Sequence, residues 1–458
     1  MTILKRLKII ARDTAFVNKT IRITVPIALQ GFLNTALNFA DTLMIGKLGE
    51  TTIAAVGLAN KVFFVFTLLI FGIVSGSGIL TAQYWGKREV ANIRRVLGIS
   101  LMLVLGGSFL FLIPAVLRPE LIMRIFTTSN ETIRIGAIYL AIIAFSYPFS
   151  AITNAYISLL RGINEVKAPV IISTIAIFVN VILNYILIFG KLGFPVLGVA
   201  GAAIATVIAR IVECGALLFV VYWEKGPAAA KFRELITFQK DFVKKFFATT
   251  LPVIANEFMW GLGVTIYSLV YGRMGDGAVA AITVTQTVEQ IFIVIFMSIS
   301  NGSAVILGNE MGAGHLEDAD EHAKNLITIQ VLLSFAAGIL AFFIRQPIIR
   351  LFSVSGEVEQ FINFCFIVFI LYLPFKMFNF INIVGILRSG GDTKACLFLD
   401  VSGVWFIGIP MAYIGGMVLH LPIYWVYAMV LTEEIYKFIL GYIRYRKKKW
   451  LRNLVATE

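Results

Sequence analysis

Ionisable side chains inside long apolar stretches are the residues of this sequence with the clearest chemical potential. Asp41 is the strongest of them, because it lies five residues before Gly46, where an apolar run ends. A charge surrounded by hydrocarbon is unfavourable unless a partner or water compensates it, so each such residue is a functional candidate. The others of this kind are Lys61, Arg210, Glu213, Glu257, Glu289, Lys376, Asp400, Glu433, Glu434 and Lys437.

Polar residues of three separate stretches fall at one depth with Asp41. At 1.5 Å per residue, Asp41 lies about 7–8 Å inside the end of its helix. Asn184 and Tyr139 lie about as deep in their own stretches, and Asn180 lies one helical turn from Asn184 on the same face. A carboxylate, two amides and a phenol thus form one predicted layer. In the alternative interpretation, the amides only link helices and Asp41 is an interface residue.

The elements that must position these residues are long apolar helices. The chain is 59% hydrophobic and only 14% charged, with a mean hydropathy of +0.88. An ordinary soluble domain carries about a quarter charged residues. About 20 apolar residues cross a bilayer as a helix, so we expect an all-α integral membrane protein with twelve transmembrane helices. The expected spans are 21–46, 53–82, 93–117, 131–158, 168–190, 195–223, 249–272, 278–308, 323–345, 358–386, 395–418 and 422–443.

Two copies of one pattern lie 226 residues apart. The matched positions are Pro26 and Pro252, Gly46 and Gly272, Gly49 and Gly275, Ala54-Ala55 and Ala280-Ala281, Gly76-Ser77 and Gly302-Ser303, and Gly86 and Gly312. We therefore predict a six-helix lobe at 1–223, a cytoplasmic linker at 224–241 and a second six-helix lobe at 242–458. An even number of spans per copy relates the lobes by a pseudo-twofold axis along the membrane normal.

This duplication is typical of a transporter that works by alternating access, with its site in a cleft between the lobes. We expect the spans 21–46, 53–82, 249–272 and 278–308 to line that cleft. A channel is less compatible, because channels are commonly built from a ring of subunits around one pore. An integral membrane enzyme is also disfavoured, since no catalytic motif for phosphate or acyl chemistry occurs in the sequence. We expect no enzyme activity.

The net charge of +13 is distributed in a way that indicates a membrane, not a nucleic acid. Basic residues collect at the N-terminus and in alternate loops of the twelve-span arrangement. By the positive-inside rule, both termini are then cytoplasmic. We expect a multi-pass protein of the cell membrane, a monomer whose partners are the lipid bilayer and small organic molecules.

The second copy carries other candidates. The position equivalent to Asp41 is Tyr267, so the two copies differ where the first has its carboxylate. The candidates for the substrate cleft are Asn34, Glu257, Trp260, Tyr267 and Glu289. We predict that Glu257 forms a buried ion pair with Lys376; the alternative is that Glu257 or Glu289 serves as counter-charge for a cationic substrate. Arg210 and Glu213 are three residues apart on one helix, which favours a pair between them.

Several motifs together resemble the multidrug and toxic compound extrusion (MATE) transporters. They are the stretch Asn38-Phe39-Ala40-Asp41-Thr42-Leu43-Met44-Ile45-Gly46, Gln83-Tyr84-Trp85-Gly86, Leu160-Arg161-Gly162, Asn180-Val181-Ile182-Leu183-Asn184-Tyr185 and Leu387-Arg388-Ser389-Gly390-Gly391-Asp392-Thr393-Lys394. The resemblance implies export of bulky, often cationic compounds in exchange for Na⁺ or H⁺. It also implies that the coupling site comprises Asp41, Tyr139, Asn180, Asn184 and Thr206.

One departure from the family bears on the coupling ion. Similar members often have an aspartate where Asn184 stands, and a second proposed site in the family uses a carboxylate on the tenth span, in which the ionisable residue of this chain is Lys376. Sodium prefers hard oxygen ligands with compensating negative charge, and the change to Asn184 removes one such charge. We therefore expect H⁺ as the coupling ion, with Na⁺ as the alternative, and neither a cofactor nor a metal site. The alternative function is a lipid-linked oligosaccharide flippase of the same superfamily, for which a more cationic cleft is expected.

Overall fold

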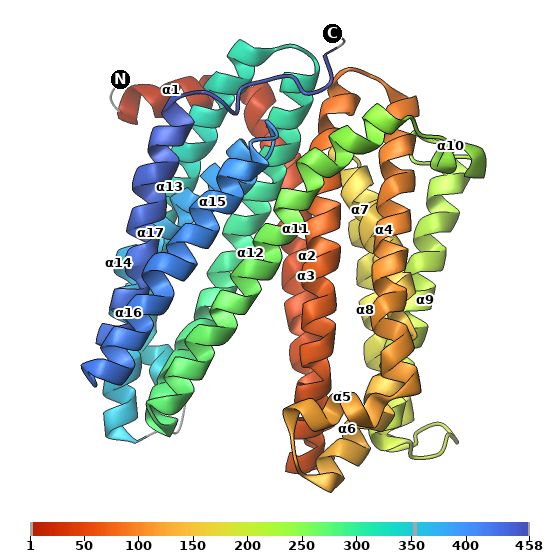
Figure 1. The fold of residues 1–458 in the computed structure, drawn as a ribbon, viewed down its shortest axis with the longest axis vertical. Coiled ribbons are helices and arrows are strands. Elements are labelled where there is room, and N and C mark those ends of the chain that lie inside the picture. The colour runs from red at the N-terminus through yellow and green to blue at the C-terminus, as the bar shows by residue number, and fades with distance from the viewer. Residues whose placement is uncertain (1–2, 351–354, 457–458) are drawn as a thin grey trace. The chain divides into compact units, whose positions relative to one another are not determined.

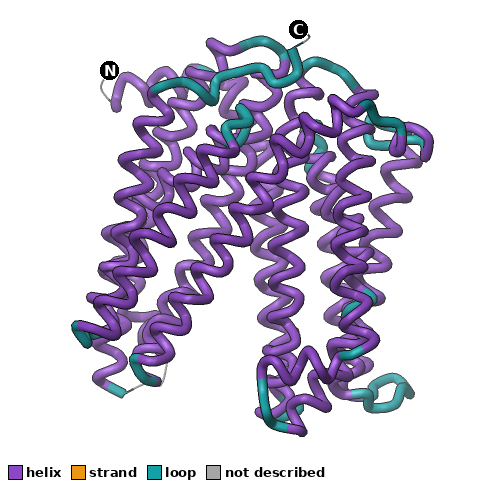
Figure 2. Tube along the Cα trace, in the orientation of Figure 1, coloured by secondary structure: helices purple, strands orange, loops and turns teal. Residues whose placement is uncertain are grey.

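The protein is helical throughout the part that the computed structural model describes, residues 3–350 and 355–456 (Figures 1 and 2). Those residues form two compact units. The N-unit is residues 29–254, and the C-unit is residues 1–28 together with 255–458. The predicted lobes 1–223 and 242–458 rest on the sequence repeat, not on packing, and their boundaries stay a prediction. Residues 1–2, 351–354 and 457–458 of those ranges lie outside the described residues.

The N-unit holds the helices that surround the predicted Asp41 layer. They are the later part of α2 (Thr14–Gly46), α3 (Glu50–Gly86), α4 (Val90–Leu117), α5 (Pro119–Phe126), α6 (Asn130–Ile143), α7 (Ser146–Gly162), α8 (Lys167–Phe189), α9 (Gly198–Glu224), α10 (Phe232–Ile236) and the first part of α11 (Lys240–Arg273). Helices α8 and α9 pack closely along their length, which sets the α8 amides against α9.

The C-unit holds the second group of helices. They are α1 (Ile3–Arg12), the first part of α2, the later part of α11, α12 (Asp276–Gly312), α13 (Leu316–Ile349), α14 (Gly356–Asn379), η1 (Phe380–Leu387), α15 (Thr393–Gly403), η2 (Val404–Gly408), α16 (Ile409–Tyr413), η3 (Ile414–Val418) and α17 (Ile423–Arg446). The η segments are π-helical, a local widening of the helix that often occurs at functional positions.

The described helices confirm an all-helical membrane protein. Ten of them are long and apolar enough to cross a bilayer, or eleven if the bent pair α6–α7 is one span. Each of the twelve predicted stretches lies on a helix or on consecutive helices. The twelfth, 422–443, lies on α17, which is not among those ten or eleven. This helix carries three charged residues near its middle, Glu433, Glu434 and Lys437.

The bend between α6 and α7 has an identifiable cause. The two helices meet at 48° across the break after Ile143. Pro148 lies in the first turn of α7, where it has no N–H to donate and its ring crowds the carbonyl four residues earlier, at Ala144. The predicted span 131–158 is therefore two helices, and Tyr139 lies on the first of them, α6.

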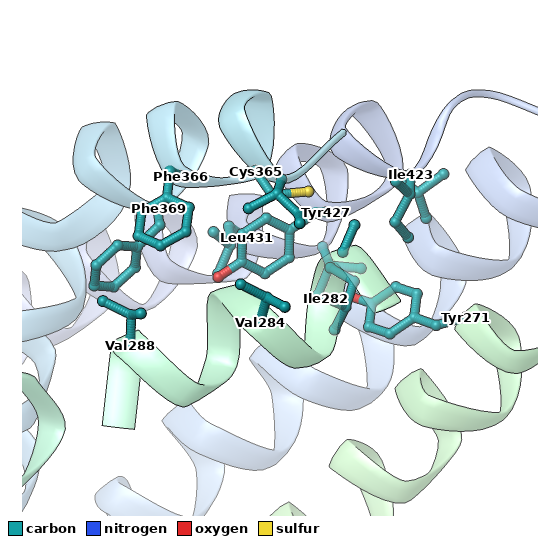
Figure 3. Close-up of a cluster of buried hydrophobic side chains, with 14 of the residues drawn as sticks. Tyr271, Ile282, Val284, Val288, Cys365, Phe366, Phe369, Ile423, Tyr427 and Leu431 are labelled. Carbon is teal, nitrogen blue, oxygen red and sulfur yellow. The ribbon is translucent and has the colours of Figure 1, made fainter. Parts of the chain in front are cut away.

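The C-unit core lies between α12, α14 and α17. Figure 3 shows Val284 and Val288 of α12 facing Cys365, Phe366 and Phe369 of α14, with Tyr427 and Leu431 of α17 beside them. The rings of Phe292 and Phe369 approach with centroids 5.8 Å apart. Each large side chain buried here contributes about 1.5–3 kcal/mol of transfer free energy where its alternative is water. This apolar block fixes the helices whose polar residues are described next.

Candidate functional site

The predicted polar layer forms in the N-unit as a chain of hydrogen bonds. Asn184 donates through Nδ2 to Asp41 Oδ1 at 2.6 Å and to Asn180 Oδ1 at 3.0 Å. Asn180 donates to Thr206 Oγ1 at 3.2 Å, and the Thr206 hydroxyl donates to the Ala202 carbonyl at 3.0 Å. The chain therefore joins α2, α8 and α9. The two amides meet because they are four residues apart on one face of α8.

Asp41 faces a cavity of about 330 Å³. Tyr139, Asn180, Thr206 and Arg210 also line it, and Asn184 lies behind it with 1% of its surface exposed. Asn184 Oδ1 has no hydrogen-bond partner among the described residues, although it is buried. The structure thus brings together all five residues predicted for the coupling site. It adds an arginine to them.

A second hydrogen-bond chain lies behind this cavity. Arg210 donates to Glu213 at 2.6 Å, which confirms the predicted pair. The other oxygen of Glu213 accepts from Ser173 at 2.7 Å, and Ser173 accepts from Gln30 at 2.9 Å. Gln30 in turn accepts from Arg161 at 2.6 Å. Four helices of the N-unit, α2, α7, α8 and α9, are joined by this chain.

The C-unit has its own cavity of about 390 Å³. Four of the five predicted substrate-cleft residues line it: Glu257, Trp260, Tyr267 and Glu289. The fifth, Asn34, is half-buried on α2 in the N-unit and lines neither cavity. The wall is partly aromatic, and its charged residues are Glu257, Glu289, Lys376, Arg388, Asp400, Glu433, Glu434 and Lys437.

The predicted ion pair between Glu257 and Lys376 is wrong. Lys376 pairs with Glu289, whose second oxygen accepts from the Tyr427 hydroxyl at 3.2 Å. Glu257 pairs with Arg388 at 2.8 Å. Arg388 was not among the candidate residues, yet its side chain is only 3% exposed and enters the unit directly after η1. A nearer cation was therefore present for each carboxylate.

A third set of charges joins α17 to the position equivalent to Asp41. The Tyr267 hydroxyl donates to Glu433 at 2.6 Å. Lys437 contacts Glu433 at 3.3 Å and Glu434 at 3.2 Å. Gly408 makes this approach possible, since a Cβ there would overlap both the Tyr267 hydroxyl and the Glu433 carboxylate. At this position of the repeat, the carboxylate of the C-unit is Glu433 of α17, whereas the carboxylate of the N-unit is Asp41 of α2.

Sequence reasoning missed Arg388, Asn256 and Gln30 as members of these networks. Asn256 donates to Asp400 at 2.9 Å. A signal was present, because Leu160-Arg161 and Leu387-Arg388 correspond in the repeat, as do Gln30 and Asn256. In both units, the arginine that follows the leucine reaches the middle of the equivalent long helix, α2 or α11. No group of three or more His, Cys, Asp or Glu side chains that could hold a metal occurs within the described ranges.

Comparison with known proteins identifies the family. The family model described as MatE matches residues 26–186 and 252–414, which is more than half of the chain. The chain belongs to the MATE family. The two matched segments of this MATE protein begin at Pro26 and Pro252, the first pair of the repeat. The match therefore shows that the protein is a transporter of this family and not an enzyme.

Relatives of this MATE protein are similar along nearly their whole length. A protein described as a probable multidrug resistance protein NorM from Thermotoga maritima is 24% identical over 96% of this chain and 94% of its own. An uncharacterized transporter YisQ from Bacillus subtilis is 23% identical over 95% of both chains. The structure of a multidrug resistance MATE family transporter of the MOP superfamily, in an outward-facing conformation, has a TM-score of 0.83 and 21% identity over 96% of both chains.

Proposed function

We propose that this protein is a secondary antiporter that exports organic, mainly cationic, compounds in exchange for protons, with Asp41 as the proton-binding residue. The observation that carries the proposal is the bond from the buried Asn184 to Asp41, a carboxylate that lines a cavity. The residues that surround this carboxylate and respond to its protonation state are Tyr139, Asn180, Asn184 and Thr206. We place the protein in the cell membrane with both termini cytoplasmic, as a monomer whose repeats act as alternating lobes.

Proton exchange at Asp41 would change its hydrogen bonds. In the structure Asp41 Oδ1 accepts from Asn184, as an ionised carboxylate does. A bound proton turns one carboxyl oxygen into a donor, and the buried Asn184 Oδ1, which lacks a partner among the described residues, is an acceptor on the same amide. A half-turn of that amide would then exchange donor for acceptor. Asn184 also donates to Asn180, which bonds to Thr206 of α9. Protonation of Asp41 would therefore change the hydrogen bonds between α8 and α9.

The nature of the cargo is argued from the C-unit cavity. Five carboxylates and three basic side chains line it, so it is negative when all are ionised. Trp260, at 40% exposed, together with Tyr267 and Tyr271, adds aromatic surface. Aromatic faces and unbalanced carboxylates both favour organic cations. A pyrophosphate-bearing lipid, the cargo of a flippase, would favour the opposite excess of charge.

Transport in proteoliposomes tests the proposal. A pH gradient without sodium should drive movement of a cationic dye such as ethidium, and Asp41→Asn should abolish this coupling. A sodium gradient at fixed pH should not drive it. If sodium alone drives transport, the proton assignment is wrong. If a broad panel of cations is not transported by the wild-type protein under either gradient, the flippase becomes the better explanation.

A further inference from the structure

The wall of the Asp41 cavity includes a positively charged residue, Arg210, that the sequence analysis did not assign to the coupling site. Among the residues that line it, the titratable ones are Asp41, Tyr139 and Arg210. The cavity therefore presents one carboxylate and one guanidinium. Arg210 is 29% exposed at its side chain, whereas Glu213, its partner, is 5% exposed. The cation is thus the more accessible member of the pair.

Arg210 has bonding capacity left over for the cavity. A guanidinium carries five N–H donors and no acceptor. Within the described residues, Arg210 makes one hydrogen bond, through Nη1 to Glu213. Because Arg210 also lines the cavity, its other donors are available to oxygens there. The oxygens of that cavity belong to Asp41, Asn180, Thr206 and their neighbours, which are the groups a metal cation would also need.

Glu213 keeps Arg210 at this place. One Glu213 oxygen accepts from Arg210, and the other accepts from Ser173, which is itself held by Gln30. Gln30 is held by Arg161, so the support extends through the unit. Fixing both oxygens of a carboxylate fixes its orientation. Arg210 is therefore a positioned charge and not a mobile surface side chain.

The repeat places a cation at the corresponding position of the C-unit. Arg210 and Lys437 are 227 residues apart, the spacing that also separates Arg161 from Arg388. Lys437 lines the C-unit cavity and contacts carboxylates of its own helix, as Arg210 does. A basic side chain on the last helix of the repeat, at the cavity wall, is thus present in both units.

We infer that Arg210 determines the ion selectivity of the Asp41 cavity, excluding sodium and leaving the proton as the ion that binds there. This inference rests on the proposed proton coupling at Asp41. A metal cation needs several oxygens at once, and the Arg210 donors compete for them while its charge repels the ion. A proton needs a single carboxyl oxygen and forms a covalent O–H bond. The guanidinium charge disfavours both ions, but only sodium also loses the oxygens for which the Arg210 donors compete, so the proton tolerates Arg210 better than sodium does.

The direct test removes the charge without leaving a buried carboxylate unpaired. The double variant Arg210→Gln/Glu213→Gln replaces both members of the pair by amides of similar shape. Sodium binding is measured on the purified full-length protein as the rise in unfolding temperature in sodium chloride over choline chloride of equal concentration. We expect no sodium-specific rise for the wild-type protein and a clear one for the double variant, corresponding to at least about tenfold tighter sodium binding.

Matched variants separate the cavity charge from general effects. Arg210→Lys keeps the positive charge and should stay insensitive to sodium. Arg134→Gln makes the same chemical change at an exposed position of α6 that does not line the cavity, and it should also stay insensitive. Adding Asp41→Asn to the double variant should abolish the gained response, because the remaining carboxylate is lost.

The outcomes are decisive in either direction. A folded double variant with the wild-type response to sodium overturns the inference. If the double variant does not fold, the single change Arg210→Gln is measured in the same way and judged by the same result. Failure of the proposed function is a different observation: Asp41→Asn in the otherwise wild-type protein would keep proton-coupled transport. If Asp41→Asn abolishes coupling while the Arg210 variants ignore sodium, only the inference on Arg210 fails.

Discussion

The two units place their buried carboxylates on different helices. The N-unit has one carboxylate, Asp41, on its first long helix, and it lies beside neutral amides. The C-unit has a tyrosine, Tyr267, at the equivalent position, and it takes a carboxylate, Glu433, from α17. In the C-unit a hydrogen bond thus joins α11 directly to α17, whereas in the N-unit Asp41 of α2 bonds to Asn184 of α8. The duplicated fold thus keeps a buried polar contact at this position in both copies but takes the partner from a different helix in each.

The arginines after the two leucines show the same contrast. Arg161 meets a neutral amide, Gln30, whereas Arg388 meets a carboxylate, Glu257. Both arginines lie at the end of the equivalent helix and point to the equivalent long helix. The N-unit thus keeps few charges around Asp41, and the C-unit balances many. We expect the C-unit to depend more heavily on complete ion pairs.

The largest effect on stability should come from breaking the C-unit pair. Arg388→Met leaves Glu257 buried without its cation, which costs about 3–5 kcal/mol of unfolding free energy. In the N-unit, Gln30→Ala removes a neutral acceptor from Arg161 and a neutral donor from Ser173, and it should cost about 1.5–3 kcal/mol. Unfolding by denaturant in detergent measures both. Adding Glu257→Gln to Arg388→Met should recover much of the loss; equal stability of the single and double variants would contradict the role of the unpaired charge.

The next effect concerns the close approach that brings Glu433 to Tyr267. Gly408→Ala places a methyl group where these side chains meet, and overpacking of this kind costs about 1–3 kcal/mol. Gly272→Ala is the control, because Gly272 lies on α11 of the same unit with no atom within 4 Å of an added Cβ. Thermal unfolding of the two variants compares them. A Gly408 variant as stable as the Gly272 variant would mean that the contact adjusts freely.

The coupling site offers a prediction of smaller size. Asn184→Asp adds a second carboxylate beside Asp41 and makes the N-unit cavity more like the charge-rich C-unit. Its attraction for cations rises, so sodium should bind about tenfold more tightly than to the wild-type protein. Sodium-specific thermal stabilisation measures this, with Asn184→Ser as the neutral control. No gain in the aspartate variant over the serine variant would count against charge as the property that separates the two cavities.

The smallest effect is expected at the linker. Arg94 of α4 donates to Glu234 at 2.8 Å and to the Pro227 carbonyl at 3.1 Å. The backbone N–H of Lys231 and the Arg94 guanidinium hold the pKa of Glu234 below its usual value. The small contribution of Glu234 to the free energy of unfolding is therefore present at pH values above the pKa that Glu234 has in the unfolded chain. It is lost as the pH falls through the lower pKa that Glu234 has in the folded protein. Glu234→Gln should cost about 0.2–1 kcal/mol by denaturant unfolding at neutral pH, and a larger loss would show that the linker is more than a surface contact.

Much of the N-unit site could be predicted from the sequence. Depth along a helix, counted at a fixed rise per residue, was sufficient to bring Asp41, Asn180 and Asn184 together. The spacing of Arg210 and Glu213 predicted their pair, because both lie on one helix. These successes share a property: each depends on the geometry of a regular helix, which the sequence alone specifies.

The C-unit pairings could not be predicted in the same way. The choice among several buried cations for Glu257 and Glu289 depends on how far a side chain reaches from the end of a helix. Arg388 follows the π-helical η1, which changes the rotation of the chain relative to a regular helix. The repeat spacing shows one additional residue before Arg388, but it does not show which way the side chain points as a result. The tyrosine at the position equivalent to Asp41 was visible in the sequence, but its bond to Glu433 depended on tertiary packing.

The most direct measurement of the central claim is proton release on binding of cargo. Ethidium is added to the purified protein in weakly buffered solution, and the pH change gives the number of protons exchanged. Antiport through Asp41 predicts release of up to one proton per bound cation, most near the pH at which Asp41 titrates, and none from Asp41→Asn. Equal proton release by the wild-type protein and by Asp41→Asn, with binding intact in both, would contradict the account.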